Sequence, residues 1–534
     1  MTERYSKTGQ MDKMQVATEM EPDGSEVARD RIRTVSELAE ISRTARANGQ
    51  RVVLAHGVFD LLHLGHVRHL EAARRLGDLL IVTVTGDRFV DKGPGRPVFS
   101  QSMRAEMLAA VGYIDWSGVN EAKTAENLIE AIQPSVYVKG SDYANSADDL
   151  TGKIDDERLL VEKYGGRVIF TDEITFSSSN LINENFNLLD PAAQAFLDNM
   201  RRDGGADRTL ELIDRVADMK VLFIGETIID QYDYVEALGK AGKENIIATL
   251  YKNEEQFAGG VVAAANHLAA FCREVEIVTC LGGLDDYDGL VNGSLQQNVS
   301  MTAIRQPRRP TVRKRRFVEE GHLNKLFEVY YMEDNPLEPR EVAEIDAHLK
   351  ERISDFDLVV VCDFGHGMMA RPLIERIHSD AKYLAVNAQV NAGNLGYNLV
   401  TKYSKANYVC IDEKEARLAA QEKSADLEFI ISERLQPNLQ CENFAVTRGT
   451  YGCLMYGKEQ EFASVPAFAH TPVDTIGAGD AFLAVTAALF AAGGDPRDVG
   501  FIGNIVGGIK IGVVGHRSSV EKGAVKKAIV SMLK

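Results

Sequence analysis

The chain has 534 residues, of which 45% are hydrophobic and 26% are charged. This composition is that of a folded globular protein and excludes a disordered, collagen-like or coiled-coil chain. Acidic residues outnumber basic ones by 78 to 60, and the net charge of −18 argues against nonspecific binding to nucleic acid or to an anionic membrane as the main role. The length corresponds to about three or four domains of ordinary size, or to fewer large ones.

The cysteines and the apolar segments indicate the compartment in which the protein works. All six cysteines lie after residue 270 and none forms a C-x-x-C pair, which favours reduced thiols over a disulfide scaffold or a zinc ribbon. Residues 1–35 form a polar tail that lacks the apolar core of a signal peptide. The longest apolar run, Ala481–Ala492, is too short to span a bilayer. We therefore expect a cytoplasmic protein.

Helices and strands alternate in the first part of the chain. Apolar residues at helical spacing predict a helix from Val35 to Asn48, and a buried strand follows at Val52–Ala55. The next predicted elements are a helix at His66–Leu76, a strand at Leu79–Thr85, a helix at Ser102–Val111 and a strand at Ser135–Lys139. This alternation indicates a parallel, doubly wound sheet. We place the domain at residues 36–185.

A second α/β series follows a helical stretch. Residues 186–218 are amphipathic and interrupted at Gly204-Gly205, and we interpret them as a connector between domains. The second domain, residues 219–534, begins with a strand at Lys220–Ile224. Further strands are predicted at Val275–Thr279, Leu358–Cys362, Tyr383–Val386, Tyr408–Ile411 and Phe444–Thr447. The fold class is therefore α/β, with two doubly wound domains.

The segment His56–Leu70 reads HGVFDLLHLGHVRHL and joins a buried strand to a helix through a turn at Gly57. Helix N-termini at such turns present N–H groups that bind phosphate. His63 and His66 lie there, where their imidazoles can donate hydrogen bonds to a phosphate whose charge rises in a transition state. Gly65 lets a ligand approach the backbone. A pair of surface histidines and a metal pair are the alternatives, but the position at a strand-to-helix turn favours phosphate chemistry.

This segment resembles the signature of the cytidylyltransferase-like nucleotidyltransferases, a glycine turn followed by H-x-G-H. Lys92–Pro97 (KGPGRP) resembles the mobile K-G-x-x-R-P loop of that family, and Arg104 lies in a matching R-x-E-x-L helix. Val138–Tyr143 (VKGSDY) resembles its V-K-G-x-D-Y strand end, and Ser177–Asn180 (SSSN) resembles the turn that opens its last helix. His56 stands where relatives usually have asparagine.

The resemblance implies which residues act in a Rossmann-like nucleotidyltransferase domain. It implies catalytic roles for His63, His66 and Lys92, and a loop carrying Lys92 and Arg96 that closes over a triphosphate. Taken alone, these two cations would indicate only a solvated loop. Nucleotide or phosphate binding is implied for Gly57, Phe59, Gly65, Arg96, Arg104, Lys139, Gly140, Asp142, Ser177, Ser178 and Ser179.

Near its C-terminal end the chain reads DTIGAGDAFLAV, from Asp474 to Val485. Gly477-Ala478-Gly479 opens an apolar helix and exposes successive backbone N–H groups to an anion. Asp480 follows at the start of that helix, where its carboxylate can accept a proton from a substrate hydroxyl as the general base of phosphoryl transfer. A lone G-x-G-D is a weak signal, because glycine turns before helices are common.

The complete string resembles the D-T-x-G-A-G-D signature of the ribokinase-like, or phosphofructokinase B, sugar kinases. The resemblance implies an α/β/α domain with a small β lid. It implies sugar binding by Asp230, in the opening segment GETIID, and by Gly259 and Gly260. It also implies a Glu415 that organises Mg²⁺ through water. Nucleotide contacts and an anion hole are implied for Thr447, Gly449, Gly452, Gly477, Ala478 and Gly479.

Several positions depart from the kinase pattern. Asp412 and Ala263 each stand where relatives have asparagine, and Asn387-Ala388-Gln389 stands where heptose kinases often read D-P-K. The run Arg305–Arg316 holds seven basic residues. This run is a solvated basic loop and strand, a nucleic-acid patch, or part of the lid whose arginines hold a phosphate already on the sugar.

Two activities in one chain imply consecutive steps. The pairing resembles the bifunctional heptose-7-phosphate 1-kinases and heptose-1-phosphate adenylyltransferases, with the domains in the opposite order. We expect a kinase that phosphorylates a sugar, heptose 7-phosphate at C1, and a nucleotidyltransferase that makes a nucleotide-activated sugar of ADP-heptose type and pyrophosphate. The alternatives are a CDP-linked polyol or another nucleotide sugar, and a sensor with one inactive domain.

The expected cofactors and partners follow from these reactions. ATP is the expected phosphoryl donor, ATP or CTP the nucleotidyl donor, and Mg²⁺ the metal that arrives with the nucleotide. The expected partners are small-molecule sugar phosphates and nucleotides, without nucleic acid or membrane. We also expect a homodimer.

Overall fold

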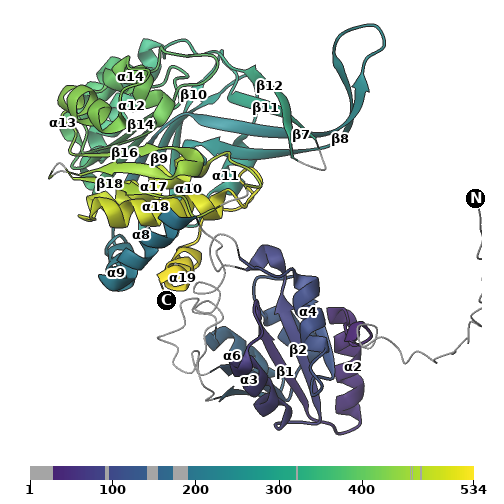
Figure 1. Cartoon of the computed structure of the whole chain (residues 1–534). Helices are drawn as coiled ribbons and strands as arrows, with labels where there is room; N and C mark the ends of the chain where they lie inside the picture. The colour runs from purple at the N-terminus through teal and green to yellow at the C-terminus, as the bar shows by residue number, and fades with distance from the viewer. Residues whose placement is uncertain are drawn as a thin grey trace, which may run out of the picture. The chain divides into compact units, whose positions relative to one another are not determined.

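The computed structural model of the chain describes residues 28–90, 96–140, 154–171, 190–319, 323–457, 459, 461–469 and 472–533. The chain folds as two compact units that divide near residue 178 (Figure 1). Both units are built on largely parallel sheets with connecting helices, which confirms the α/β fold class.

The N-terminal unit has a five-stranded parallel sheet in the order β3-β2-β1-β4-β5. The chain runs outward from β1 to β3 and then crosses to β4, so the strand order reverses between β1 and β4. Ligands of open α/β sheets bind at such a reversal, beyond the carboxyl ends of the strands. The strands are β1 (Val52–Gly57), β2 (Leu79–Thr85), β3 (Trp116–Asn120), β4 (Val136–Gly140) and β5 (Arg167–Thr171).

Alternation along β1 divides the core of this unit into two layers. Val53 and Ala55 belong to a buried cluster with α3 and α4, whereas Val52 and Leu54 belong to a second cluster with α2 and α5. Both sheet faces are therefore covered, as a doubly wound fold requires. The helices are α2 (Val35–Ala47), α3 (Leu64–Arg74), α4 (Gln101–Ala109), α5 (Glu126–Ile132) and α6 (Ile154–Lys163).

The C-terminal unit has a nine-stranded sheet in the order β10-β9-β6-β13-β14-β15-β16-β17-β18, in which β17 and β18 are antiparallel. Six of these strands are predicted from the sequence, and β10, β17 and β18 are not. The strands are β6 (Lys220–Gly225), β9 (Glu274–Gly282), β10 (Val299–Gln306), β13 (Leu358–Asp363), β14 (Leu384–Ala388), β15 (Tyr408–Asp412), β16 (Asn443–Thr447), β17 (Cys453–Tyr456) and β18 (Phe462–Val465).

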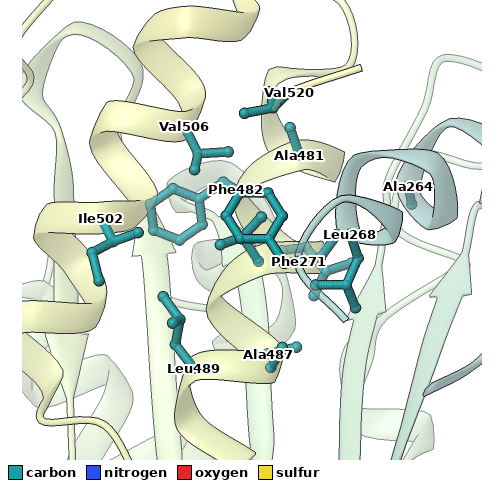
Figure 2. Packing of buried hydrophobic residues seen from close by; sticks show 14 of the residues in the cluster. Ala264, Leu268, Phe271, Ala481, Phe482, Ala487, Leu489, Ile502, Val506 and Val520 are labelled. Carbon is teal, nitrogen blue, oxygen red and sulfur yellow. The ribbon is translucent and has the colours of Figure 1, made fainter. Parts of the chain in front are cut away.

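Helices cover both faces of this sheet (Figure 1). One face carries α12 (Pro339–Arg352), α13 (Arg371–Asp380) and α14 (Glu413–Ala420), and the other carries α10 (Val261–Ala269), α17 (Ala478–Ala491) and α18 (Pro496–Lys510). Figure 2 shows Phe482 of α17 among side chains of α10 and α18, including Leu268 and Val506. This central position explains why α17 is apolar around its circumference.

Two helices that precede the nine-stranded sheet in the chain pack into the same core. Leu197 and Met200 of α8 (Pro191–Arg202) and Leu212 and Ile213 of α9 (Gly205–Arg215) are buried in the cluster that contains α17 and α18. Both helices also contact α19 (Lys522–Leu533). Helices α8 and α9, which the sequence analysis interprets as a connector, therefore pack as part of the C-terminal unit.

A second, four-stranded sheet in the order β12-β11-β7-β8 forms the β lid. Its strands are β7 (Thr227–Lys240), β8 (Ile247–Gly260), β11 (Val312–Glu319) and β12 (Lys325–Tyr331). The antiparallel pair β7 and β8 forms a long hairpin that extends beyond the unit (Figure 1). At its base, the pairing brings residues near Asp230 alongside Gly259.

The cysteines agree with the expectation of reduced thiols, because all six are free and buried. Among the helices that the structure describes, none is both long and apolar enough to cross a membrane.

Candidate active sites

The first candidate site lies where β1 ends, at the reversal point of the N-terminal sheet. Phe59 adopts a left-handed backbone conformation there, with φ 49°, and is buried. Its ring meets the imidazole of His66 edge-on, with the ring centroids 5.2 Å apart. A Cβ atom on Gly57 would come within 3.2 Å of the same ring. Gly57 and Phe59 therefore shape the turn that leads into α3.

The structure brings the two predicted histidines together at the N-terminus of α3. His63 is the N-cap residue, and its Nδ1 accepts a hydrogen bond from the N–H of Gly65 at 3.1 Å. Because Nδ1 accepts, neutral His63 carries its proton on Nε2. His66 stacks on His63, with the centroids 4.0 Å and the planes 27° apart. This pair can donate to an anion that binds at the helix end.

Asp60, which sequence reasoning missed, holds the chain that follows Arg96. Its Oδ1 accepts hydrogen bonds from the N–H groups of Val98 at 2.7 Å and Phe99 at 3.1 Å. Asp60 is 1% exposed, so these bonds form in a dry environment and fix the start of α4 beside the β1 turn. The only sequence signal was its place inside the segment that contains H-x-G-H.

Arg104 differs from its predicted role. Its side chain is fully buried, and its guanidinium donates to the carbonyl oxygens of Val58, Thr85 and Phe99 at 2.5, 2.8 and 2.9 Å. It also pairs with Asp87 at 2.6 Å. The guanidinium thus holds three neighbouring loops together through these contacts. We therefore correct the role of Arg104 from a phosphate contact to a residue that positions the β1 turn.

Lys139 and Gly140 lie at the end of β4, next to β1. Lys139 Nζ pairs with Glu157 at 2.9 Å and lies 5.1 Å from the ring centroid of Tyr137. Burial, with the charge of Lys139 as a second cause, lowers the pKa of His56 to about 3. Neutral His56 contacts Thr83 through Nδ1 at 2.9 Å. The residue that replaces the usual asparagine therefore bonds to the neighbouring strand β2.

The remaining predicted residues of this domain are Lys92, Asp142, Ser177, Ser178 and Ser179, which lie outside the described residues.

The second candidate site lies where α17 begins. Gly477 caps the helix with φ 78°, and a Cβ atom there would come within 2.6 Å of Cε1 of His516. The first N–H groups of a helix have no intrahelical acceptor, and the predicted anion hole of Gly477, Ala478 and Gly479 lies at this helix end, where the N–H of Ala478 donates to the carbonyl of Thr475 at 3.4 Å. A Cβ atom on Gly479 would meet no atom within 4 Å. Packing therefore does not require glycine at 479, and the position faces open space.

Asp480 occupies the first turn of α17, beside this anion hole. Its Oδ1 accepts a hydrogen bond from Nε2 of Gln389 at 2.8 Å. Burial raises the pKa of Asp480, while the charge of His516 and the bond from Gln389 act in the opposite direction. A raised pKa makes the carboxylate a better proton acceptor. Gln389, noted in the sequence only as a departure, positions this carboxylate.

Asp230 lies on β7 between the guanidinium of Arg316 and the imidazole of His516. Arg316 of β11 donates to its Oδ1, and Nε2 of His516 lies 3.3 Å from its Oδ2. Burial alone would raise the pKa of Asp230, but the hydrogen bond to His516 and the charge of Arg316 outweigh it and lower that pKa. A Cβ atom on Gly259 would overlap Oδ2 of Asp230, so only glycine fits there. Gly260 has φ 61°, a conformation that favours glycine.

Asp474 accepts hydrogen bonds from the lid and from the loop in front of the anion hole, and so connects the two. Its carboxylate accepts from the hydroxyl of Tyr232 and from Nζ of Lys325, both at 2.6 Å, and both donors belong to the lid. It also accepts from the N–H groups of Ile476 at 3.1 Å and Gly515 at 2.8 Å. The aspartate that opens the D-T-x-G-A-G-D signature therefore holds the loop in front of α17 and contacts the lid.

The predicted nucleotide side lies at the ends of β15 and β16. Asp412 of β15 pairs in register with Thr447 of β16, which leads into the turn of Gly449 and Gly452. The N–H of Arg448 donates to the carbonyl of Gly452 at 2.8 Å and closes this turn. Both glycines have positive φ, 56° and 83°, so the turn favours glycine at each.

Glu415 is part of a capping box at the start of α14. Its Oε2 accepts from the N–H of Asp412 at 2.8 Å and its Oε1 from the N–H of Val390 at 2.9 Å. Burial, then the charge of Asp412, raises the pKa of Glu415 to about 7, and Asp480 adds to this rise. Because both oxygens already accept backbone bonds, contact with Mg²⁺ through water fits better than direct ligation.

Asp480 is the other acidic group that bears on how Mg²⁺ would be held. Mg²⁺ that arrives with a nucleotide is usually held by one or two carboxylates. Within the described ranges, no group of three or more His, Cys, Asp or Glu side chains could hold a metal ion. Glu415 and Asp480 are two carboxylates of this kind, and the arrival of Mg²⁺ with the nucleotide stays a prediction.

A cavity of about 250 Å³ opens beyond the end of β13, and no predicted site residue lines it. Its wall residue Asp363 accepts from Tyr403 at 2.7 Å and pairs with Lys402 at 2.5 Å. The carbonyl of Asp363 also accepts from the N–H of Gln389 at 2.8 Å, so the cavity borders the Asp480 site. The lining residues are Asp334, Asp363, Gly365, Gly367, Met369, Gly393, Asn394, Tyr397, Asn398 and Lys402.

Known proteins resemble both units. Residues 54–185 match the cytidylyltransferase-like family. In this N-terminal part, the bifunctional protein HldE of Syntrophotalea carbinolica is 40% identical over 156 residues, which is 29% of this chain and 30% of that protein. The HldE protein of Trichlorobacter lovleyi is 46% identical over 133 residues, 24% of this chain and 26% of that protein. The chain thus matches less than a third of the length of these relatives.

The kinase unit has its own matches. A structure of a putative ribokinase from Agrobacterium tumefaciens aligns with 59% of this chain and 98% of its own, at 18% identity and a TM-score of 0.44. The family model of the pfkB carbohydrate kinases matches residues 218–523, more than half of the chain. The chain therefore belongs to the pfkB family of carbohydrate kinases and carries a cytidylyltransferase-like domain ahead of its kinase domain.

Proposed function

We propose that this chain is a bifunctional enzyme that phosphorylates heptose 7-phosphate at C1 and transfers an adenylyl group from ATP to a heptose 1-phosphate. The observation that carries the proposal is that one chain contains two candidate phosphate sites, each at the N-terminus of a helix. His63 and His66 stack at a helix N-terminus in one unit, and Asp480 lies beside the anion hole of the other. The similarity of the N-terminal part to HldE proteins supports heptose as the sugar.

In the kinase step, the C1 hydroxyl of the sugar attacks the γ-phosphorus of ATP, and ADP leaves. Asp480 accepts the hydroxyl proton, and its bond to Gln389 keeps the carboxylate oriented. The N–H groups at the start of α17 stabilise charge on the transferred phosphoryl group. Asp230 holds sugar hydroxyls, and Mg²⁺ neutralises charge on the nucleotide when it is bound.

In the nucleotidyl step, an oxygen of the sugar 1-phosphate attacks the α-phosphorus of ATP, and the bond to pyrophosphate breaks. His63 and His66 donate hydrogen bonds to the oxygens on which charge develops. Lys139 and Arg96 add positive charge near the triphosphate, together with Lys92. No covalent enzyme intermediate is needed, because the sugar phosphate is itself the nucleophile.

A second candidate has the same architecture but uses CTP with a polyol phosphate, or makes another nucleotide sugar. Two observations favour it: His56 bonds to β2 where relatives have asparagine, and Asn387-Ala388-Gln389 replaces the D-P-K of heptose kinases. These positions belong to the two sites, so they bear on the base and on the sugar. The homodimer stays a prediction.

The test is a matrix of sugar phosphates against ATP, CTP, GTP and UTP, with ADP and pyrophosphate measured separately. We expect ADP formation from ATP with heptose 7-phosphate, and pyrophosphate release from ATP with heptose 1-phosphate. Pyrophosphate release that requires CTP favours the second candidate. Failure of either reaction with every combination contradicts a bifunctional enzyme and favours a sensor with an inactive domain.

A further inference from the structure

Lys510, the last residue of α18, is a buried cation that the proposed mechanism does not use. Its side chain is fully buried, and its Nζ donates to the carbonyl oxygens of Ile476 at 2.9 Å and Gly515 at 2.6 Å. Burying an ammonium is costly even when it is hydrogen-bonded, so a buried charge is weak evidence for a role in stability alone. The position of Lys510 therefore indicates a further role for its ammonium.

Asp474 binds the same two residues through their N–H groups. Its Oδ1 accepts from the N–H of Ile476 at 3.1 Å, and its Oδ2 accepts from the N–H of Gly515 at 2.8 Å. The ammonium takes the carbonyls and the carboxylate takes the N–H groups, so neither segment can turn without loss of a charge-assisted hydrogen bond. Together, Lys510 and Asp474 fix the backbone of the loop before α17 and of the turn after α18.

The carbonyl that Lys510 holds determines where the first N–H of the anion hole points. In a planar trans peptide unit the C=O and N–H bonds point in opposite directions, and the carbonyl of Ile476 shares its unit with the N–H of Gly477. Lys510 therefore directs that N–H away from its ammonium. Among the described residues no acceptor is found for the Gly477 N–H, whereas the N–H of Ala478 donates to the carbonyl of Thr475. The Gly477 N–H is a donor that an anion can use.

The aliphatic part of Lys510 packs against the same glycine. A Cβ atom on Gly477 would come within 3.3 Å of Cε of Lys510 and within 2.6 Å of Cε1 of His516. Lys510 thus acts on the helix cap twice, by hydrogen bonding to the preceding carbonyl and by contact with Gly477. Both interactions restrict rotation of the peptide unit between residues 476 and 477.

We propose that Lys510 is a positioning residue of the kinase step, which aims the N–H of Gly477 at the phosphoryl group that is transferred. This inference rests on the kinase step of the proposed function and does not depend on which sugar is the acceptor. The N–H donates to a phosphoryl oxygen on which charge develops, and a donor held in place beforehand needs no reorganisation during the reaction. Lys510 itself acts through the backbone and does not contact the substrate.

A neutral side chain of similar length tests this role. We expect Lys510→Met to lower kcat for phosphoryl transfer from ATP to heptose 7-phosphate by about 100-fold, the size of one lost oxyanion donor. The KM values for ATP and for the sugar should change less than about threefold, because the aimed N–H matters most in the transition state. Lys526→Met, which removes a lysine of the same unit that pairs with Asp214, is the matched control and should keep normal turnover.

Chemical rescue separates positioning from a general loss of stability. Lys510→Ala deletes the side chain beyond Cβ, and propylammonium supplies the missing carbons together with the ammonium. We expect propylammonium chloride to raise kcat of folded Lys510→Ala by at least about tenfold, and tetramethylammonium chloride, which has no N–H donor, to leave it unchanged. Normal turnover in Lys510→Met, or a defect in folded Lys510→Ala that both salts leave unchanged, overturns the proposal.

A binding experiment on the wild type decides the matter if the Lys510 variants do not fold, or if neither heptose is a substrate, which would refute the proposed function alone. Full-length protein is labelled with ¹⁵N-glycine, and Gly477→Ala assigns the Gly477 signal. Because ADP lacks the γ-phosphate, we expect the non-hydrolysable ATP analogue AMP-PNP with Mg²⁺ to shift this signal more than ADP with Mg²⁺ does. An equal response to the two nucleotides, or no response to either, overturns the proposal.

Discussion

Two glycines at the start of α17 have different reasons to be glycine. Gly477 has φ 78° and lies against His516, so the fold requires it. A methyl group at Gly479 would meet no protein atom within 4 Å, so the fold gives no reason for glycine there, whereas the proposed phosphate site gives one. Stability and activity should therefore separate at these two positions.

We expect Gly479→Ala to leave the free energy of unfolding unchanged or higher, because alanine favours a helix, while kinase turnover falls by about 100-fold. Gly477→Ala should instead lower the free energy of unfolding by more than about 1 kcal/mol, through backbone strain and the clash with His516. Urea denaturation and ADP formation measure the two effects. A Gly479→Ala enzyme with normal turnover contradicts the anion hole.

Gln389 lowers the pKa of Asp480, the proposed general base of the kinase step. Its hydrogen bond stabilises the charged form of Asp480, so it lowers a pKa that burial has raised. In Gln389→Leu the pKa of Asp480 should rise further. Since the base acts when deprotonated, the acid limb of the kcat/KM profile should move to higher pH. Asn387→Ala, at a buried neighbour that donates to the carbonyl of Cys410, is the control; an unmoved or lowered limb in Gln389→Leu contradicts this account.

The histidine pair should act on the rate of nucleotidyl transfer more than on nucleotide affinity. Each of His63→Ala and His66→Ala should cost on the order of a hundredfold in turnover, similar to the loss of one oxyanion donor. The kinase activity should not change.

Direct attack of the sugar phosphate also predicts inversion of configuration at the α-phosphorus. A chiral α-thiotriphosphate reports the configuration, and retention would indicate a covalent nucleotidyl-enzyme.

At the scale of elements, the loop between β18 and α17 depends on a buried lysine at the end of α18. Lys510 is fully buried, and its Nζ donates to the carbonyls of Ile476 at 2.9 Å and Gly515 at 2.6 Å. These residues flank the anion hole and the turn that carries His516. The lysine therefore connects the two backbone segments next to Asp480.

We expect Lys510→Met to destabilise the kinase unit by about 2–4 kcal/mol, because two buried carbonyls lose their donor. Lys526→Met, which removes a lysine that pairs with the more exposed Asp214, is the matched control and should cost less than about 1 kcal/mol. Thermal unfolding with and without nucleotide checks both. Equal stability of the two variants would show that Lys510 is not part of the scaffold.

Elements with continuous apolar runs were predictable from the sequence, and half-exposed ones were not. Strands β6 and β13 are buried almost throughout, and their runs of Val, Leu and Ile stand out. Strand β8 contains the polar run KNEE and gains its structure from pairing with β7, so periodicity gave no signal. Strand β17 reads CLMY and lacks the run of Val, Leu and Ile that marks β6 and β13.

The residues of the candidate sites divide in the same way into those that the sequence predicts and those that it does not. His63, His66, Gly477 and Asp480 lie within short motifs whose spacing carries the chemistry, and the structure brings each set together. The partners of Asp230 are Arg316 of β11 and His516 of a turn beyond α18. The basic run Arg305–Arg316 marks the arginine in the sequence, whereas no local pattern marks His516.

At the scale of the whole molecule, the order of domains along the chain agrees with the sequence analysis. The cytidylyltransferase-like match ends at residue 185 and the pfkB match begins at residue 218. Helices α8 and α9 fill most of the interval and pack on the kinase core. Each unit has its own buried core, so we expect each activity to survive loss of the other.

The most direct test of the central claim, two independent active sites in one chain, combines Asp480→Asn with a His63→Ala/His66→Ala variant. Pyrophosphate release is measured with ATP, heptose 7-phosphate and an added phosphatase specific for C7, because the kinase product carries a C7 phosphate that the heptose 1-phosphate of the second step lacks. Wild type should release pyrophosphate, and each variant alone should release about 100-fold less or lower still, since each lacks one step. An equimolar mixture of the two variants should restore release. A mixture as inactive as its components, or an Asp480→Asn enzyme that matches wild type, would contradict the account.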